Sequence, residues 1–167
     1  MCGFLGEFGK NPSSKSQFNS LLKLSENRGP DMIGYYSNFD QEKNQAPFMQ
    51  FGFNRLSILD LSENANQPMI SNSKRYVVMC NGEITNFLKL KREMGLNQKD
   101  LRSNSDTEIL CHAFDYDGVK ETINRINGMY AIVIYDSINQ NIYLIRDPAG
   151  IKPIYFAQTK YGWIFAS

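Results

Sequence analysis

Four strand-like runs in residues 129–167 constrain the fold more than any other feature of this chain. Each run is short, apolar and rich in β-branched or aromatic residues, a composition typical of strands. The connections at residues 137–139 and 160–162 are short enough for hairpins, which join antiparallel strands. The sequence therefore predicts an antiparallel sheet built from MYAIVIYD, NIYLIRD, KPIYFAQ and YGWIFAS.

The preceding segments alternate between strand-like and helix-like patterns. CGFLGEFG opens the chain as a strand in which glycines at every third position suit close packing. The helical spacing of Phe18, Leu21 and Leu22 predicts an amphipathic helix over residues 13–27. Further strands are expected at 32–39, 47–61 and 76–80, and further helices at 86–94, 105–114 and 119–126. We therefore expect one α+β domain, dominated by antiparallel sheet, over residues 1–167.

Composition argues against several functional classes. A formal net charge of +1 disfavours nucleic acid or an anionic membrane as partner. The chain lacks the roughly 18 consecutive apolar residues of a membrane span, and its N-terminus does not resemble a signal peptide. Three cysteines without CxxC spacing are typical of reduced thiols in a cytoplasm, and one histidine disfavours a histidine-rich metal site. The strand-like end, WIFAS, predicts that the sequence is a piece of a longer chain.

Cys2 is the first candidate for chemistry. Its structural interpretation is a small buried hydrophobic residue. Removal of Met1, which the small second residue permits, would instead give Cys2 a free α-amino group. The unperturbed pKa of such a group is about 7.7–8.0, so it can act as general base for its own thiol without a histidine partner. We interpret Cys80 and Cys111 as core thiols and His112 as a structural helix residue.

Asn81 and Gly82 directly follow the apolar run at 76–80. Their structural interpretation is a hairpin turn, for which Asn-Gly is a strong signal. Their functional interpretation is an oxyanion hole, in which a carboxamide and the next backbone N–H face a developing negative charge. One such donor contributes roughly 3–4 kcal/mol to catalysis. The dipeptide alone leaves both interpretations open.

Two charged residues could hold the ends of a free amino acid. Arg55 is either a solvated or paired charge, or a fork for an α-carboxylate. Ser105 and Glu108 have the spacing of a capping box at a helix start. Asp106, between them, favours the positive helix end and could also bind a substrate ammonium. Arg55 and Asp106 together would orient the substrate side chain.

Five blocks of sequence occur in the order seen in class II glutamine amidotransferases: MCG at 1–3, RGPD at 28–31, RLSI at 55–58, NGEI at 81–84 and SDTE at 105–108. A sixth, RDP with GIKP within 146–153, narrows the match. Any one block is weak, but six in register are specific and cover essentially the full chain. The chain resembles the N-terminal glutaminase domain of glutamine-hydrolysing asparagine synthetases.

This resemblance implies a fold and a set of site residues. The fold would be the four-layer αββα sandwich of N-terminal nucleophile hydrolases, with two mainly antiparallel sheets. Cys2, after loss of Met1, would attack the side-chain amide of L-glutamine, and the thioester would be hydrolysed to glutamate. The remaining roles would fall to Asn81 and Gly82 for the oxyanion, Arg55 for the α-carboxylate, Asp106 with Glu83 for the α-amine, and the main chain around Ile58 and Leu59 for the pocket wall.

The resemblance also implies a cytoplasmic parent protein, in which ammonia travels through a tunnel to a C-terminal synthetase domain. ATP and Mg²⁺ are expected for that domain, and no metal or cofactor is expected for the glutaminase domain. A homodimer is left open. Three positions depart from the usual family pattern, at Asn27, Thr85 and Ala149. Because of these departures, the carboxylate that the parent enzyme amidates could be aspartate or a different acceptor.

Two further alternatives remain. One is the glutaminase part of a sugar-phosphate aminotransferase, which the RGPD and GIKP blocks disfavour. The other is a catalytically silent glutaminase-like binding module, which the presence of Cys2, Asn81 and Asp106 disfavours.

Overall fold

The structure, a computed structural model, describes residues 2–39 and 47–167. In these ranges the strands form two antiparallel sheets, here called sheet A and sheet B. Sheet A has the strand order β2-β3-β1-β9-β8, with bounds Met32–Ser37, Phe48–Arg55, Gly3–Gly9, Gly162–Ala166 and Tyr155–Thr159. Sheet B has the order β4-β5-β6-β7, with bounds Met69–Ile70, Tyr76–Ile84, Gly128–Asp136 and Asn141–Arg146.

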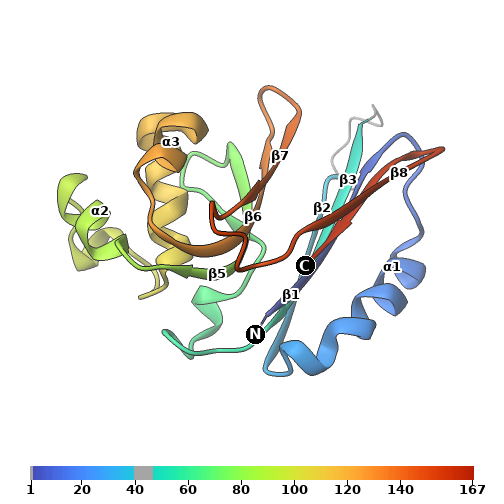
Figure 1. Ribbon diagram of the computed structural model, residues 1–167, viewed down its shortest axis with the longest axis horizontal. Helices are drawn as coiled ribbons and strands as arrows, with labels where there is room; N and C mark the ends of the chain where they lie inside the picture. Colours follow the sequence, from blue (N-terminus) through green and yellow to red (C-terminus); the bar gives the residue numbers. More distant parts are fainter. Residues whose placement is uncertain (1, 40–46) are drawn as a thin grey trace.

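Helices cover the outer face of each sheet. From left to right in Figure 1 the layers are α2 with α3, sheet B, sheet A, and α1. The α-helices and 3-10 helices are α1 (Lys15–Leu22), η1 (Lys23–Arg28), η2 (Glu63–Ala65), α2 (Phe87–Glu93), η3 (Gln98–Asp100) and α3 (Asp106–Arg125). The predicted four-layer αββα sandwich is thereby confirmed.

Three apolar clusters hold the layers together. Alternation along β1 separates two of them, because Phe4 faces sheet B whereas Leu5 faces α1. The cluster between the sheets also contains Met49, Phe51, Phe53, Val77, Met79, Ala131, Val133, Tyr135 and Phe165. Sheet B packs against α3 through a second cluster, and Phe18 and Leu22 of α1 complete the third. The centres of both sheets, β1 and β5, are therefore fixed by packing on two sides.

Most predicted elements are present, including the hairpins β6-β7 and β8-β9. The helix predicted over 13–27 is α-helical only to Leu22 and continues as a 3-10 turn. Leu21 is 42% exposed and not part of the core. The two helices predicted at 105–114 and 119–126 form α3, which is interrupted at Gly118, where φ is 78°.

Among the strand boundaries that differ from the prediction, two shape the site. The strand expected to reach residue 61 ends at Arg55, because the next N–H groups bond to side chains: that of Leu56 to Cys2 Sγ and that of Ser57 to the Asp31 carboxylate. The hairpin-turn interpretation of Asn81-Gly82 is wrong. Strand β5 runs on to Ile84, because this dipeptide pairs in register with residues 130–131 of β6.

The capping box predicted at 105–108 is only half formed. The Ser105 hydroxyl accepts a hydrogen bond from the Thr107 N–H at 3.1 Å, as a cap should. The Glu108 carboxylate turns away from the cap, because it accepts the N–H groups of Arg102 and Ser103 at 2.9 and 2.7 Å. This leaves the mouth of α3 to Asp106.

Candidate active site

Cys2 lies immediately before β1, at the edge of the sandwich. Its thiol is half-buried and free. The Leu56 N–H donates to Cys2 Sγ at 3.4 Å, and the thiol donates to Leu56 O at 3.7 Å. The position therefore combines access with main-chain contacts on the sulfur.

The other two thiols have different surroundings. Cys80 and Cys111 are both buried, and burial raises the pKa of each thiol well above its ordinary value. They stay protonated at neutral pH, which confirms their interpretation as core thiols.

A cavity of about 200 Å³ opens beside Cys2. It lies between the end of β3, the middle of β5 and the start of α3. The cavity brings together all the site residues proposed from the sequence: Cys2, Arg55, Ile58, Leu59, Asn81, Gly82, Glu83 and Asp106. Because these residues come from separate segments of the chain, their convergence is a product of the fold.

Asn81 and Gly82 sit side by side on the cavity wall. The Asn81 side chain is 1% exposed, and its Nδ2 donates to Ser167 Oγ at 2.9 Å. At residue 82, a Cβ would lie 2.1 Å from Met129 O and 2.6 Å from Tyr130 Cα. Only glycine lets β5 approach β6 this closely, and the approach sets the position of the Gly82 backbone beside the Asn81 carboxamide.

The Arg55 guanidinium is held by a loop. Its Nη1 donates to Ser62 O at 2.8 Å, and its Nη2 donates to Asp60 O. Nη1 also contacts Met32 Sδ at 3.4 Å. A guanidinium has five N–H donors, so these contacts orient Arg55 without using all of them. The remaining donors can serve an anionic group in the cavity.

Asp106 occupies the first position of α3. Its Oδ2 accepts the Ile84 N–H at 2.9 Å and its Oδ1 accepts the Thr107 N–H at 2.8 Å. Burial raises the pKa of the Asp106 carboxyl, although the two N–H bonds act in the opposite direction. The nearby Glu83 carboxylate also raises it. A cation bound within the cavity would stabilise the charged form of this desolvated carboxyl.

Sequence reasoning did not assign several residues that line this cavity or contact its wall. Gln67 is buried; its Oε1 accepts the Cys80 N–H at 2.6 Å and its Nε2 donates to Cys80 O at 3.3 Å. The Gln67 amide thus replaces a neighbouring strand for β5, just before Asn81. Leu56 contacts the sulfur of Cys2, and Ser167 contacts the Asn81 carboxamide. No local pattern marks these positions, because their partners are distant in sequence.

A rigid turn places Lys152 on the cavity wall. Asp147 accepts the N–H groups of Ile151 and Lys152, each at 2.9 Å, and that of Tyr130 at 3.2 Å. Burial alone would raise the pKa of Asp147, but these N–H groups together lower it. The RDP and GIKP blocks are therefore one structural unit built on a buried carboxylate.

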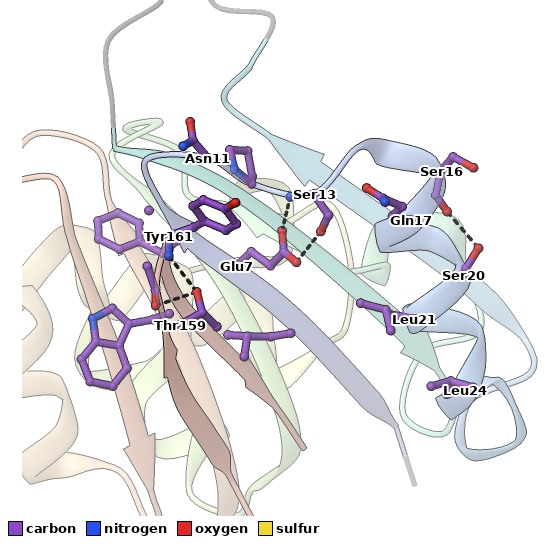
Figure 2. A pocket seen from close by; sticks show the side chains of 16 residues that line it. Glu7, Asn11, Ser13, Ser16, Gln17, Ser20, Leu21, Leu24, Thr159 and Tyr161 are labelled. Carbon is purple, nitrogen blue, oxygen red and sulfur yellow. Dashed lines mark hydrogen bonds between the residues drawn. The ribbon is translucent and has the colours of Figure 1, made fainter.

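A larger groove lies on the outer face of sheet A, away from these residues. It measures about 960 Å³ and runs between α1 and strand β9 (Figure 2). Figure 2 shows Leu21 and Leu24 on one side and Thr159 and Tyr161 on the other, with Glu7 bonded to Ser13 between them. The groove contains none of the candidate site residues.

Metal-binding clusters and membrane-spanning helices are both absent from the described part of the chain. Residues 2–39 and 47–167 contain no group of three or more His, Cys, Asp or Glu side chains placed to hold a metal ion. Within the same ranges, no helix has the length and apolar character needed to cross a membrane.

Fold and site together define a class of protein. An αββα sandwich whose first strand follows a half-buried cysteine, facing a cavity with a carboxamide, is the arrangement of N-terminal nucleophile amidotransferases. The fold is shared with glutamine phosphoribosylpyrophosphate amidotransferase from B. subtilis, at a TM-score of 0.79 and 18% identity over 99% of this chain and 41% of that one. The fold is also shared with a structure described as the allosteric regulatory enzyme of purine biosynthesis. Its TM-score is 0.77 and its sequence identity 19%, over 99% of this chain and 42% of that one.

Sequence comparison identifies the family within this class. The profile of the family described as "Glutamine amidotransferase domain" matches residues 1–167, and the chain belongs to that family. It is 33% identical to asparagine synthetase [glutamine-hydrolyzing] 1 of Bacillus subtilis (strain 168), over 100% of this chain and 26% of that protein. It is 30% identical to the human asparagine synthetase [glutamine-hydrolyzing], over 98% of this chain and 28% of that protein. The chain thus spans about a quarter of the length of these relatives.

Proposed function

We propose that this domain hydrolyses the side-chain amide of L-glutamine to glutamate and ammonia, with Cys2 as the nucleophile. One observation carries the proposal. Cys2 lines the same cavity as Asn81 and Asp106. Met1, whose removal the mechanism needs, lies outside the described residues.

Substrate binding follows from the charges around the cavity. The Arg55 guanidinium would hold the α-carboxylate, and Asp106, helped by Glu83, would hold the α-ammonium. The main chain around Ile58 and Leu59 would form the remaining wall, since both side chains are exposed. A volume of about 200 Å³ is below the range of drug-sized ligand pockets, which suits one small amino acid.

The chemistry needs one nucleophile and one base, and Cys2 would supply both. The α-amine takes the thiol proton as sulfur attacks the amide carbon. The carbonyl oxygen becomes an oxyanion that accepts hydrogen bonds from Asn81 Nδ2 and the Gly82 N–H. The C–N bond then breaks, the ammonium returns its proton to nitrogen, and ammonia leaves a thioester. Water, deprotonated by the same amine, cleaves the thioester to glutamate and restores the thiol. We propose that these steps require no metal or cofactor.

The test is covalent labelling combined with turnover. A glutamine-mimicking diazoketone should add once, on residue 2, as seen by intact mass and peptide mapping. Cys2→Ser should lose nearly all glutamate production and the adduct while keeping the melting temperature, because the half-buried thiol contributes little to packing. His112 has no role in the proposed mechanism, so His112→Ala should still turn over glutamine.

A blocked N-terminus provides a second test of the same proposal. A fusion that retains Met1 acylates the Cys2 nitrogen and removes the proposed base, so it should be as inactive as Cys2→Ser. An active fusion would contradict the role of the amine. A Met1-processed protein without adduct or turnover would instead indicate a glutaminase-like binding module.

We also propose the setting of this domain. Its relatives are glutamine-hydrolyzing asparagine synthetases about four times its length. Residues 1–167 would form the glutaminase domain of a cytoplasmic protein whose C-terminal synthetase domain uses ATP and Mg²⁺ to make asparagine with the released ammonia. Amidation of a different carboxylate is the alternative. Reading the parent gene beyond Ser167, then assaying asparagine formation by the full-length enzyme, distinguishes the two.

A further inference from the structure

Ser167 links the two halves of the proposed active site. Its backbone N–H donates to Phe4 O at 3.1 Å, two residues after Cys2. Its hydroxyl accepts the hydrogen bond from Asn81 Nδ2 at 2.9 Å. Ser167 is 5% exposed and Asn81 1%, so water does not compete for this bond. One residue thus bonds both to the strand that follows the nucleophile, in sheet A, and to the carboxamide in sheet B.

In the structure, the Ser167 hydroxyl is bonded to the nitrogen end of the Asn81 carboxamide. An asparagine amide rotates easily about its last torsion, and its oxygen and nitrogen ends are nearly the same size. An oxyanion needs the N–H end, because the C=O end would repel it. The amide nitrogen carries two N–H groups. In the observed arrangement Ser167 accepts one of them, and the second N–H remains for a ligand in the cavity that Asn81 lines.

We propose that Ser167 is a positioning residue for the oxyanion hole. Its hydroxyl holds the nitrogen end of the Asn81 carboxamide towards the substrate carbonyl and ties that donor to the strand that follows Cys2. This inference rests on the proposed glutaminase function. It assigns to the residue that follows β9 a part in the chemistry that no local sequence pattern indicates.

Kinetics on single variants give the first test. Ser167→Ala should lower kcat for glutamine hydrolysis by roughly tenfold, less than the 10²–10³ lost with an entire oxyanion donor, because Asn81 remains but is no longer oriented. KM should stay within about twofold, since the oxyanion forms only after substrate is bound. Ser167→Thr retains the hydroxyl and should recover most of kcat. If Ser167→Ala does not fold, Ser167→Cys keeps the shape with a weaker acceptor and should show the same loss.

A double-mutant cycle gives the decisive readout. If Ser167 acts only through the carboxamide, Ser167→Ala should have no further effect on kcat in an Asn81→Ala background. A merely structural serine would lower kcat by the same factor in both backgrounds, which would overturn the inference. Unchanged kcat in Ser167→Ala would overturn it as well.

Controls separate this inference from the function on which it rests. Ser71 is another buried serine whose hydroxyl is bonded, here to the Asp115 carboxylate, and it does not line the cavity. Ser71→Ala should lower the melting temperature and leave kcat unchanged. If Cys2→Ser loses turnover but Ser167→Ala keeps the wild-type kcat, the role of Ser167 is refuted and the proposed function stands. A wild-type chain without Cys2-dependent turnover would refute the proposed function and the inference together.

Discussion

At the scale of single residues, the surroundings of each group decide what its chemistry can be. Cys2 has a backbone N–H 3.4 Å from its sulfur and an opening to the cavity, whereas burial keeps Cys80 and Cys111 protonated. Arg55 and Asp106 show the same principle for charge. Each is held by main-chain groups, so each keeps a fixed direction before any substrate arrives.

Asp106 leads to a prediction about pH. Its carboxyl pKa lies above the ordinary 3.8, so at a given acidic pH it holds its proton more than an exposed aspartate would. An ammonium is attracted by the carboxylate and not by the acid. KM for glutamine should therefore rise as the pH falls through this raised pKa. Asp106→Asn should raise KM at neutral pH by about 30-fold or more, from a loss of about 2 kcal/mol or more, and should flatten the pH dependence.

The matched control for this prediction is Asp115→Asn. Asp115 lies on the same helix and bonds to Ser71 and Ser73, outside the cavity. The dependence of KM on pH in Asp115→Asn should match that of the wild type. A KM of Asp106→Asn that stays near the wild-type value would contradict the ammonium-binding role.

At the scale of elements, β5 is the strand on which the site is built. It passes through Asn81 and Gly82 without turning because β6 pairs with it along its full length. The Gln67 amide completes the bonding of Cys80 on its other edge. The oxyanion candidates are thus part of a strand held on both edges, which is more rigid than a loop.

Gly82→Ala tests this arrangement. The new Cβ would meet backbone atoms of β6, which cannot rotate away as a side chain could. We expect a loss of about 2–3 kcal/mol in the free energy of unfolding, measured in urea, and a large fall in kcat as the strands separate.

Gly95 provides the comparison for Gly82. Its φ is 67°, against 158° at Gly82, and a Cβ at Gly95 would meet nothing within 4 Å. Gly95→Ala should therefore lose only about 1 kcal/mol and keep its turnover. Equal behaviour of the two variants would show that the close approach of β5 and β6 is unimportant.

At the scale of the whole molecule, the site lies where two sheets meet. The strand after Cys2 belongs to sheet A and the strand with Asn81 belongs to sheet B, so the inter-sheet core sets the distance between nucleophile and oxyanion donors. Phe51 is central to that core, fully buried, with its ring edge-on to Phe165 at 5.8 Å between centroids.

Phe51→Ala should remove about 3–5 kcal/mol from the free energy of unfolding, because the cavity it leaves is enclosed by both sheets. Urea unfolding followed by fluorescence measures this loss. Leu24→Ala, at a residue that is 82% exposed, should change the stability by no more than about 0.5 kcal/mol. If Phe51→Ala proves as stable as Leu24→Ala, the inter-sheet core does not have the role described.

Most of the strands and helices, and the chemistry available at Cys2, Asn81, Arg55 and Asp106, could be predicted from the sequence. These are local properties: alternation, helical spacing, turn chemistry and residue type act over a few neighbouring positions. The structure was needed to show that β5 continues through Asn81-Gly82, that the strand before Leu56 ends at Arg55, and that Gln67 and Ser167 support the site. Each of these outcomes depends on a hydrogen bond or strand pairing between residues far apart in the chain, and no local pattern contains that information.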